Sequence, residues 1–101
     1  MREVELISIL TSNRKNKKLV ATFKVDTKII HIHFGLKGSS TFVEGADTKT
    51  RDNYLARHNN SRENWNDPLT PASLSAHILW GTSQNINKNI TLFKKKFNLG
   101  D

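Results

Sequence analysis

Lysines and arginines are the side chains with the clearest chemical meaning in this sequence, because they gather in two short runs. The first run is Arg14, Lys15, Lys17 and Lys18, and the second is Lys94, Lys95 and Lys96. Such clusters attract polyanions: the phosphates of nucleic acid first, and otherwise an acidic protein or a membrane surface. The second run falls in the last turn of a predicted helix, where cations also complement the helix dipole. The first run is therefore the better candidate for a phosphate contact.

Further candidate contacts lie between the two runs. Lys37 stands between Gly35 and Gly38, a spacing that would let backbone amides approach a phosphate, although it is also typical of a plain turn. Three more basic side chains lie on a predicted helix and the loop that follows it: Arg57, His58 and Arg62.

Aromatic residues accompany this last group, and two interpretations remain open. Tyr54, Trp65 and Trp80 could stack on bases while arginine contacts phosphate. Alternatively, they belong to the core and Arg57 binds backbone carbonyls of the asparagine-rich loop. The second interpretation is favoured for Trp80 and Tyr54, and Trp65 is undecided.

His31 and His33 are two residues apart on a predicted strand, which puts both imidazoles on one face, roughly 6.5–7 Å apart. A metal could bridge such a pair with a third ligand from His58 or Asp47. Because no carboxylate follows at a known motif spacing, the sequence favours a half-exposed polar strand face and no metal site.

Composition excludes several classes of enzyme. The chain has 101 residues, with 16 Lys and Arg against 9 Asp and Glu and a net charge of +7. It has no cysteine, so disulfides and thiolate metal sites are excluded. Neither a nucleophile motif of the G-x-S-x-G type nor a G-x-x-x-x-G-K-[ST] phosphate loop occurs. We therefore expect a non-enzymatic protein without catalytic residues, metal or cofactor.

The sequence also predicts where the protein resides. No apolar run approaches the ~18–20 residues of a membrane span. Glu3 and Glu5 stand where a signal peptide needs a basic and then an apolar stretch. We expect an intracellular protein that is not secreted and does not bind membranes.

Hydrophobic periodicity predicts strands first and helices afterwards. Val4–Leu10, Leu19–Val25 and Ile29–Phe34 indicate strands, and residues 39–44 could add a fourth. Capping signals and apolar spacing predict helices over about 47–58, 71–80 and 84–97, the last two beginning after Thr70 and after Thr82-Ser83.

The predicted fold is α+β, a small antiparallel meander of three to four strands followed by three short helices packed on it. A chain this short normally builds one core, so we expect a single domain over 1–101, with strands within about 3–43.

Several short motifs, taken in order, resemble those of a family of small basic proteins encoded by large nucleocytoplasmic DNA viruses of algae and amoebae. They are His33-Phe34-Gly35, Tyr54-x-x-Arg57-His58, Glu63-Asn64-Trp65-Asn66-Asp67-Pro68 and Ser75-Ala76-His77-Ile78-Leu79-Trp80. The resemblance extends from Ile7 to Leu99. It implies a viral origin, with residence in the virus factory or nucleus of the infected host cell or in the virion. It implies no activity and no catalytic residues, because that family is uncharacterised.

The leading hypothesis is a basic module that binds the phosphate backbone of DNA or RNA without strong sequence specificity. The alternative is a structural virion or assembly component that docks on an acidic viral protein. A histidine-based metal enzyme or nuclease is a third, weaker hypothesis. The leading hypothesis expects the two basic runs to converge, after folding, on one cationic surface.

Overall fold

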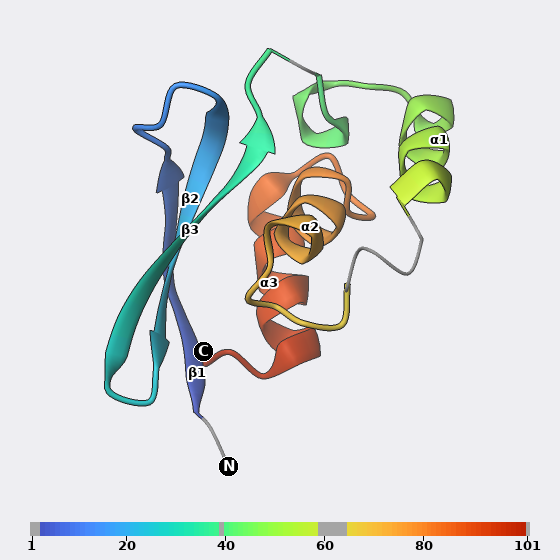
Figure 1. The fold of residues 1–101 in the computed structure, drawn as a ribbon. Coiled ribbons are helices and arrows are strands. Elements are labelled where there is room, and N and C mark those ends of the chain that lie inside the picture. Colours follow the sequence, from blue (N-terminus) through green and yellow to red (C-terminus); the bar gives the residue numbers. More distant parts are fainter. Residues whose placement is uncertain (1–2, 39, 59–64, 101) are drawn as a thin grey trace.

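The sheet consists of three antiparallel strands that follow one another in space as they do along the chain (Figure 1). In this computed structural model, residues 3–38, 40–58 and 65–100 are described. The strands are β1 (Val4–Thr11), β2 (Lys17–Val25) and β3 (Lys28–Leu36). All described helices lie on one side of this sheet, so the predicted α+β class is confirmed.

Alternation along the strands gives the sheet one buried and one open face. Ala21, Phe23 and Phe34 point towards the helices and are fully buried. On the opposite face, which we call the outer face, Val20 pairs with His33 and Thr22 pairs with His31. Successive residues of β2 and β3 therefore point to opposite faces of the sheet, as the placement of His31 and His33 on one face requires.

The helical half begins with a single turn of 3-10 helix and ends with the longest helix. The apolar side of this last helix, α3 (Ile86–Phe97), packs against the buried face of the sheet, and its Phe93 is fully buried there. Leu99, just after α3, is also buried, and its carbonyl accepts the β1 backbone N–H of Leu6 (3.0 Å). The elements are η1 (Phe42–Glu44), α1 (Thr48–His58), α2 (Pro71–Leu74), η2 (Ser75–Leu79) and α3 (Ile86–Phe97).

Two of the predicted helix starts are confirmed by their hydrogen bonds. The Asp47 carboxylate accepts the backbone N–H of Thr50 (2.8 Å) at the start of α1. The Thr70 hydroxyl accepts the N–H of Ser73 (3.1 Å), with Pro71 as the first helical residue of α2. These short-range caps satisfy backbone donors that a helix start leaves unpaired.

Among the differences from the predicted elements, four have an identifiable local reason. The possible fourth strand is instead η1, since Glu44 accepts both the N–H and the hydroxyl of Thr41 and closes a turn. The single helix predicted over 71–80 is two elements, α2 and the π-helical η2. The π-helical spacing shows in the backbone N–H of Trp80, which donates to the carbonyl of Ser75, five residues earlier. The last helix starts two residues late, because Asn85 caps it in place of Thr82-Ser83.

The fourth of these differences is the end of β3, which the sequence placed at Phe34, before Gly35. The strand continues to Leu36, because Gly35 adopts φ +81°, a conformation that other residues rarely take. A Cβ at Gly35 would also lie 2.8 Å from Leu79 Cδ1. Gly35 therefore allows the close approach of β3 to η2.

A buried amide closes the connection between η2 and α3. Asn89 is 1% exposed, and its Nδ2 donates to the carbonyls of Ile78 (2.9 Å) and Ser83 (2.7 Å). Its Oδ1 accepts the N–H of Ser83 (3.1 Å). Gly81 is required beside it, since a Cβ there would lie 2.7 Å from Asn89 Cγ.

None of the helices built from the described residues is long and apolar enough to cross a membrane.

Candidate nucleic-acid interface

The turn between β1 and β2 carries the first basic run, and Ser12 fixes its shape. Ser12 is buried, and its hydroxyl accepts the backbone N–H of Arg14 (3.0 Å). The backbone N–H of Ser12 donates to Lys18 O, and that of Lys17 donates to Arg14 O. These bonds hold Arg14 and Lys15 exposed at the tip of the turn and Lys17 at its base.

The fourth member of this run does not belong to the exposed surface. Lys18 Nζ forms an ion pair with Glu44 Oε1 (3.0 Å), and its side chain is only 14% exposed. Partial burial opposes ionisation of Glu44, but hydrogen bonds from Thr41 and Lys18 outweigh it and lower the pKa of this carboxyl. Lys18 therefore ties β2 to η1, and its charge is already compensated.

Lys37 lies beside the same turn but on the η1 side. Its backbone N–H donates to Asn16 O (3.0 Å), so this amide is not available to a phosphate. Its side chain lines a shallow hollow together with Lys18 and Glu44. The expected contact of backbone amides between Gly35 and Gly38 thus reduces to the exposed ammonium of Lys37.

The two strand histidines lie on the outer face next to the basic turn. His33 Nδ1 shares a hydrogen bond with Ser12 Oγ (2.7 Å), and His31 Nδ1 shares one with Thr22 Oγ1 (2.9 Å). Both rings are therefore oriented by neighbouring hydroxyl groups. A shallow hollow over this part of the face is lined by residues of all three strands and the turn: Leu10, Thr11, Asn13, Arg14, Val20, His31 and His33.

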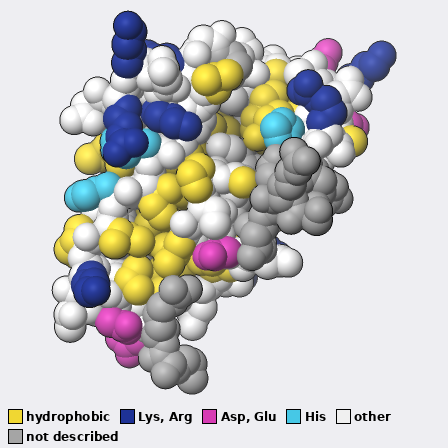
Figure 2. All heavy atoms as spheres, viewed as in Figure 1, with side chains coloured by type: hydrophobic (Ala, Val, Ile, Leu, Met, Phe, Trp, Pro, Cys, Tyr) yellow, Lys and Arg dark blue, Asp and Glu magenta, His cyan; other side chains and the backbone are white. Residues whose placement is uncertain are grey.

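The electrostatics of His33 show that the turn cations act on this face. Partial burial is the main cause of its lowered pKa, and the charges of Arg14, His31 and Lys17 lower it further. The charges of Arg14 and Lys17, which add to the effect of burial in disfavouring protonation of His33, would also attract an anion. Figure 2 shows Lys and Arg side chains gathered beside histidine at this end of the molecule.

The second basic run lies at the opposite end of the sheet. The backbone N–H of Leu99 donates to Lys94 O, and Leu99 O accepts the N–H of Leu6, near the start of β1. The strand from Leu6 to Thr11 spans roughly 17 Å, and the basic turn begins beyond it. This distance exceeds the Debye length of about 8 Å at physiological salt. The expected convergence of the two runs on one surface is therefore wrong.

Each lysine of the second run belongs to the C-terminal end of α3. Lys95 O accepts the backbone N–H of Asn98 (3.4 Å), and Lys94 O accepts that of Leu99 (2.9 Å), so both carbonyls close the helix. The side chains of Lys95 and Lys96 are exposed, whereas Lys94 is half-buried. Their charges complement the helix dipole. Lys94, Lys95 and Lys96 therefore do not share a surface with the first run, and their own contact with phosphate stays a prediction.

Acidic side chains stand between the second run and the outer face. A hollow at the β2–β3 end of the sheet is lined by Glu3, Glu5, Lys24 and Asp26. The carboxylate of Asp26 also accepts the backbone N–H of Glu3 (2.8 Å). The outer face thus has a cationic end at the β1–β2 turn and a mixed, acid-containing end at the β2–β3 turn.

Helix α1 carries two more of the predicted contacts, and its own attachment explains part of its composition. Arg51 Nε donates to Gly81 O (2.8 Å), and Tyr54 stacks on Trp80 with ring centroids 4.3 Å apart. His58 stacks on Tyr54 in turn (4.2 Å), while Arg57 is exposed. Tyr54 and Trp80 are therefore structural, as expected. Arg62 lies outside the described residues.

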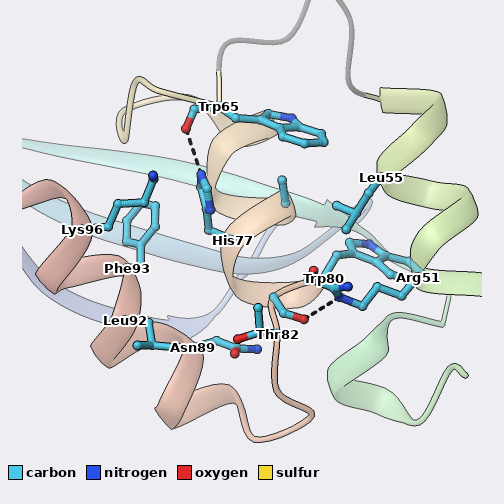
Figure 3. Close-up of a pocket in the computed structure, with 12 residues that line it drawn as sticks. Arg51, Leu55, Trp65, His77, Trp80, Thr82, Asn89, Leu92, Phe93 and Lys96 are labelled. Carbon is cyan, nitrogen blue, oxygen red and sulfur yellow. Dashed lines mark hydrogen bonds between the residues drawn. The ribbon is translucent and has the colours of Figure 1, made fainter. Parts of the chain in front are cut away.

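Between α1, η2 and α3 lies a cleft of about 220 Å³ that no sequence motif indicated (Figure 3). Trp65, Leu55 and Trp80 line it, and His77 Nε2 donates to Trp65 O (2.8 Å) within it. Burial lowers the pKa of His77, the bond to Trp65 raises it, and the charge of Lys96 lowers it again; the net shift is downward. Burial thus disfavours the protonated form of His77, and its hydrogen bond anchors the backbone at Trp65.

The positions of His, Asp and Glu side chains bear on the metal site considered for His31 and His33. No group of three His, Asp or Glu side chains comes together as a candidate metal site in residues 3–38, 40–58 and 65–100. Of the proposed ligands, Asp47 caps α1 and His58 stacks on Tyr54. Both of these residues therefore have structural roles away from His31 and His33.

Comparison with known proteins yields one family. The model of a family of unknown function, DUF5754, matches residues 7–58, slightly more than half of the chain. The matched segment carries the basic turn and both outer-face histidines, and it excludes Lys94, Lys95 and Lys96. No curated protein and no solved structure matches the chain.

Proposed function

We propose that this chain, which belongs to DUF5754, a family of unknown function, binds nucleic acid. The contact is to the phosphate backbone and lies at the β1–β2 turn. The observation that carries this proposal is the compact group of Arg14, Lys15 and Lys17 on a turn whose shape Ser12 fixes, with Arg14 and Lys15 exposed at its tip.

The proposal assigns different weights to the basic residues. Arg14, Lys15 and Lys17 are the principal contacts, with Lys37 at their margin. Lys18 is removed from the interface by its ion pair with Glu44. Four other basic residues of the sequence prediction are too remote from the turn to act with it and would serve at most as separate, weaker contacts: Arg57, Lys94, Lys95 and Lys96.

Counterion release gives the expected strength of the salt dependence. Neutralising the phosphates opposite three cations predicts a slope of log K against log salt of about −2 for a single strand and about −2.7 for a duplex. Raising salt from ~50 to ~200 mM should then weaken binding by about 20- to 40-fold.

Fluorescence anisotropy with labelled oligo(dT), oligo(rU) and a mixed-sequence duplex tests the proposal. Lys15→Gln/Lys17→Gln should flatten the single-strand slope by about 1.4. Lys28→Gln/Lys95→Gln is the matched control, because it removes the same charge from exposed lysines outside the turn and should change the slope little. Absence of binding at ~50 mM salt, or equal effects of the two double variants, would refute the proposed interface.

An acidic protein partner is the alternative that the same cations allow. The separation of the two basic runs favours it over a single long nucleic-acid track, since small separate patches suit local docking. It predicts a co-purifying partner that nuclease treatment does not release. The viral origin suggested by the sequence motifs stays a prediction.

A further inference from the structure

The outer face beside the basic turn combines apolar surface with two oriented aromatic rings. Leu10 is 62% exposed there, and the register places it opposite Val20, which in turn lies opposite His33. An apolar surface next to cations is poorly matched to the sugar–phosphate exterior of a duplex, which is charged throughout. It matches a ligand whose flat apolar groups and phosphates are both accessible.

The two imidazoles are prepared for contact with such flat groups. Each ring is held at Nδ1 by a hydroxyl group of the sheet, His31 by Thr22 and His33 by Ser12. Nε2 of either ring forms no hydrogen bond to the residues that the structure describes. Because the rings are already oriented, little side-chain entropy is lost when a partner stacks on them.

Resting on the proposed function, we propose that the nucleic acid bound at the basic turn is single-stranded, and that its unpaired bases stack on His31 and His33 across the outer face. The phosphates next to the stacked bases extend towards Arg14 and Lys17, at the cationic end of the outer face. Glu3, Glu5 and Asp26 disfavour continuation of the strand over the other end.

The spacing of the two rings argues for unpaired bases. Residues two apart on a strand lie roughly 6.5–7 Å apart, whereas bases in a duplex stack at roughly 3.4 Å. Two successive bases can reach both rings only when they separate from each other, which a continuous duplex stack does not allow. Histidine is among the side chains on which unpaired bases stack in single-strand recognition.

Stacking and phosphate contact are separable by experiment, because only phosphate contact changes the salt slope. Binding of labelled oligo(dT), oligo(rU) and a duplex of equal length is measured by anisotropy at one fixed pH for all variants. We expect single strands to bind at least about tenfold tighter than the duplex.

Substitutions at the rings test their role. His33→Ala should weaken single-strand binding by about tenfold with an unchanged salt slope. His33→Phe, which keeps a flat ring, should restore affinity to within about threefold. Ser12→Ala should weaken binding less than His33→Ala, because it only loosens the ring and the turn. Circular dichroism of each variant establishes that the fold is retained.

The results separate this inference from the proposed function. Equal affinity for single strands and duplex, or an alanine variant that binds as well as the original chain, overturns the stacking inference and leaves phosphate binding standing. Equal loss in the alanine and phenylalanine variants also overturns it, because a hydrogen-bonding role would then be indicated. Absence of binding to all three probes refutes the proposed function itself.

Discussion

Asn89→Leu removes a buried hydrogen-bonding group while keeping nearly the same side-chain size and branching. The substitution leaves the Ile78 carbonyl unpaired in a fully buried site, which costs about 2 kcal/mol. The Ser83 carbonyl and N–H also lose their partners, but they are partly accessible to water and cost about 1 kcal/mol each. The expected loss of stability is therefore about 4 kcal/mol.

Urea unfolding followed by tryptophan fluorescence measures this loss. A domain of this size has a total stability of about 5–15 kcal/mol, so the variant should still fold at ~20 °C. With an m-value near ~1.5 kcal/mol/M, the midpoint should fall by roughly 2–3 M urea. Trp80 reports on the transition directly, because it is buried close to the affected turn.

Asn87→Leu is the matched control, since it makes the same chemical change on the exposed side of α3. It should shift the stability by no more than about 0.5 kcal/mol. If Asn89→Leu unfolded at the same urea concentration as the control, the amide would not be the connection between η2 and α3, and the hydrogen-bond argument would be refuted.

Three further predictions concern stability. Burial lowers the pKa of His77 in the folded state below its unfolded value of about 6.5. As the pH drops below about 6.5, the unfolded chain therefore takes up a proton first and Tm should fall, but much less so in His77→Gln. Gly35→Ala should lower Tm more than Gly38→Ala, because both glycines have positive φ but only at Gly35 would the new Cβ meet a neighbouring side chain. Equal losses of Tm would contradict the close approach of β3 to η2. Glu44 has a lowered pKa, so its contribution exists above about pH 4.5 and is lost at lower pH; Glu44→Gln should flatten the Tm profile there, and an unchanged profile would argue against its ion pair.

The fold was predictable where the signals are local. Hydrophobic periodicity predicted the three strands, and Asp47 and Thr70 marked helix starts through caps only three residues long. The same logic failed at η1, because the reciprocal Thr41–Glu44 contacts make a turn from residues that also suit a strand. It failed again at η2, where the extra residue of a π-helix leaves no mark in apolar spacing.

The candidate site was predictable in composition but not in geometry. The sequence identified Arg14, Lys15 and Lys17, because clustered cations are visible without a fold. It could not separate them from Lys18, whose partner Glu44 lies 26 residues away. Nor could it place the second run at the other end of β1, since that follows from the docking of the chain after α3 on the start of the strand.

Ser12 was missed although a signal for it exists. A serine two residues before a basic turn can accept the backbone N–H of residue i+2 and so fix the turn, as it does with Arg14. Its second bond, to His33, depends on the pairing of distant strands and has no sequence signature.

Backbone amide chemical shifts during a titration with oligo(dT) test the central claim most directly. The account predicts that the largest shifts fall on residues 12–17 and 31–33, with little change over residues 94–96 or along α1. Largest shifts at Lys94, Lys95 and Lys96, or at Arg57 and His58, would contradict it, because the nucleic acid would then be bound away from the sheet.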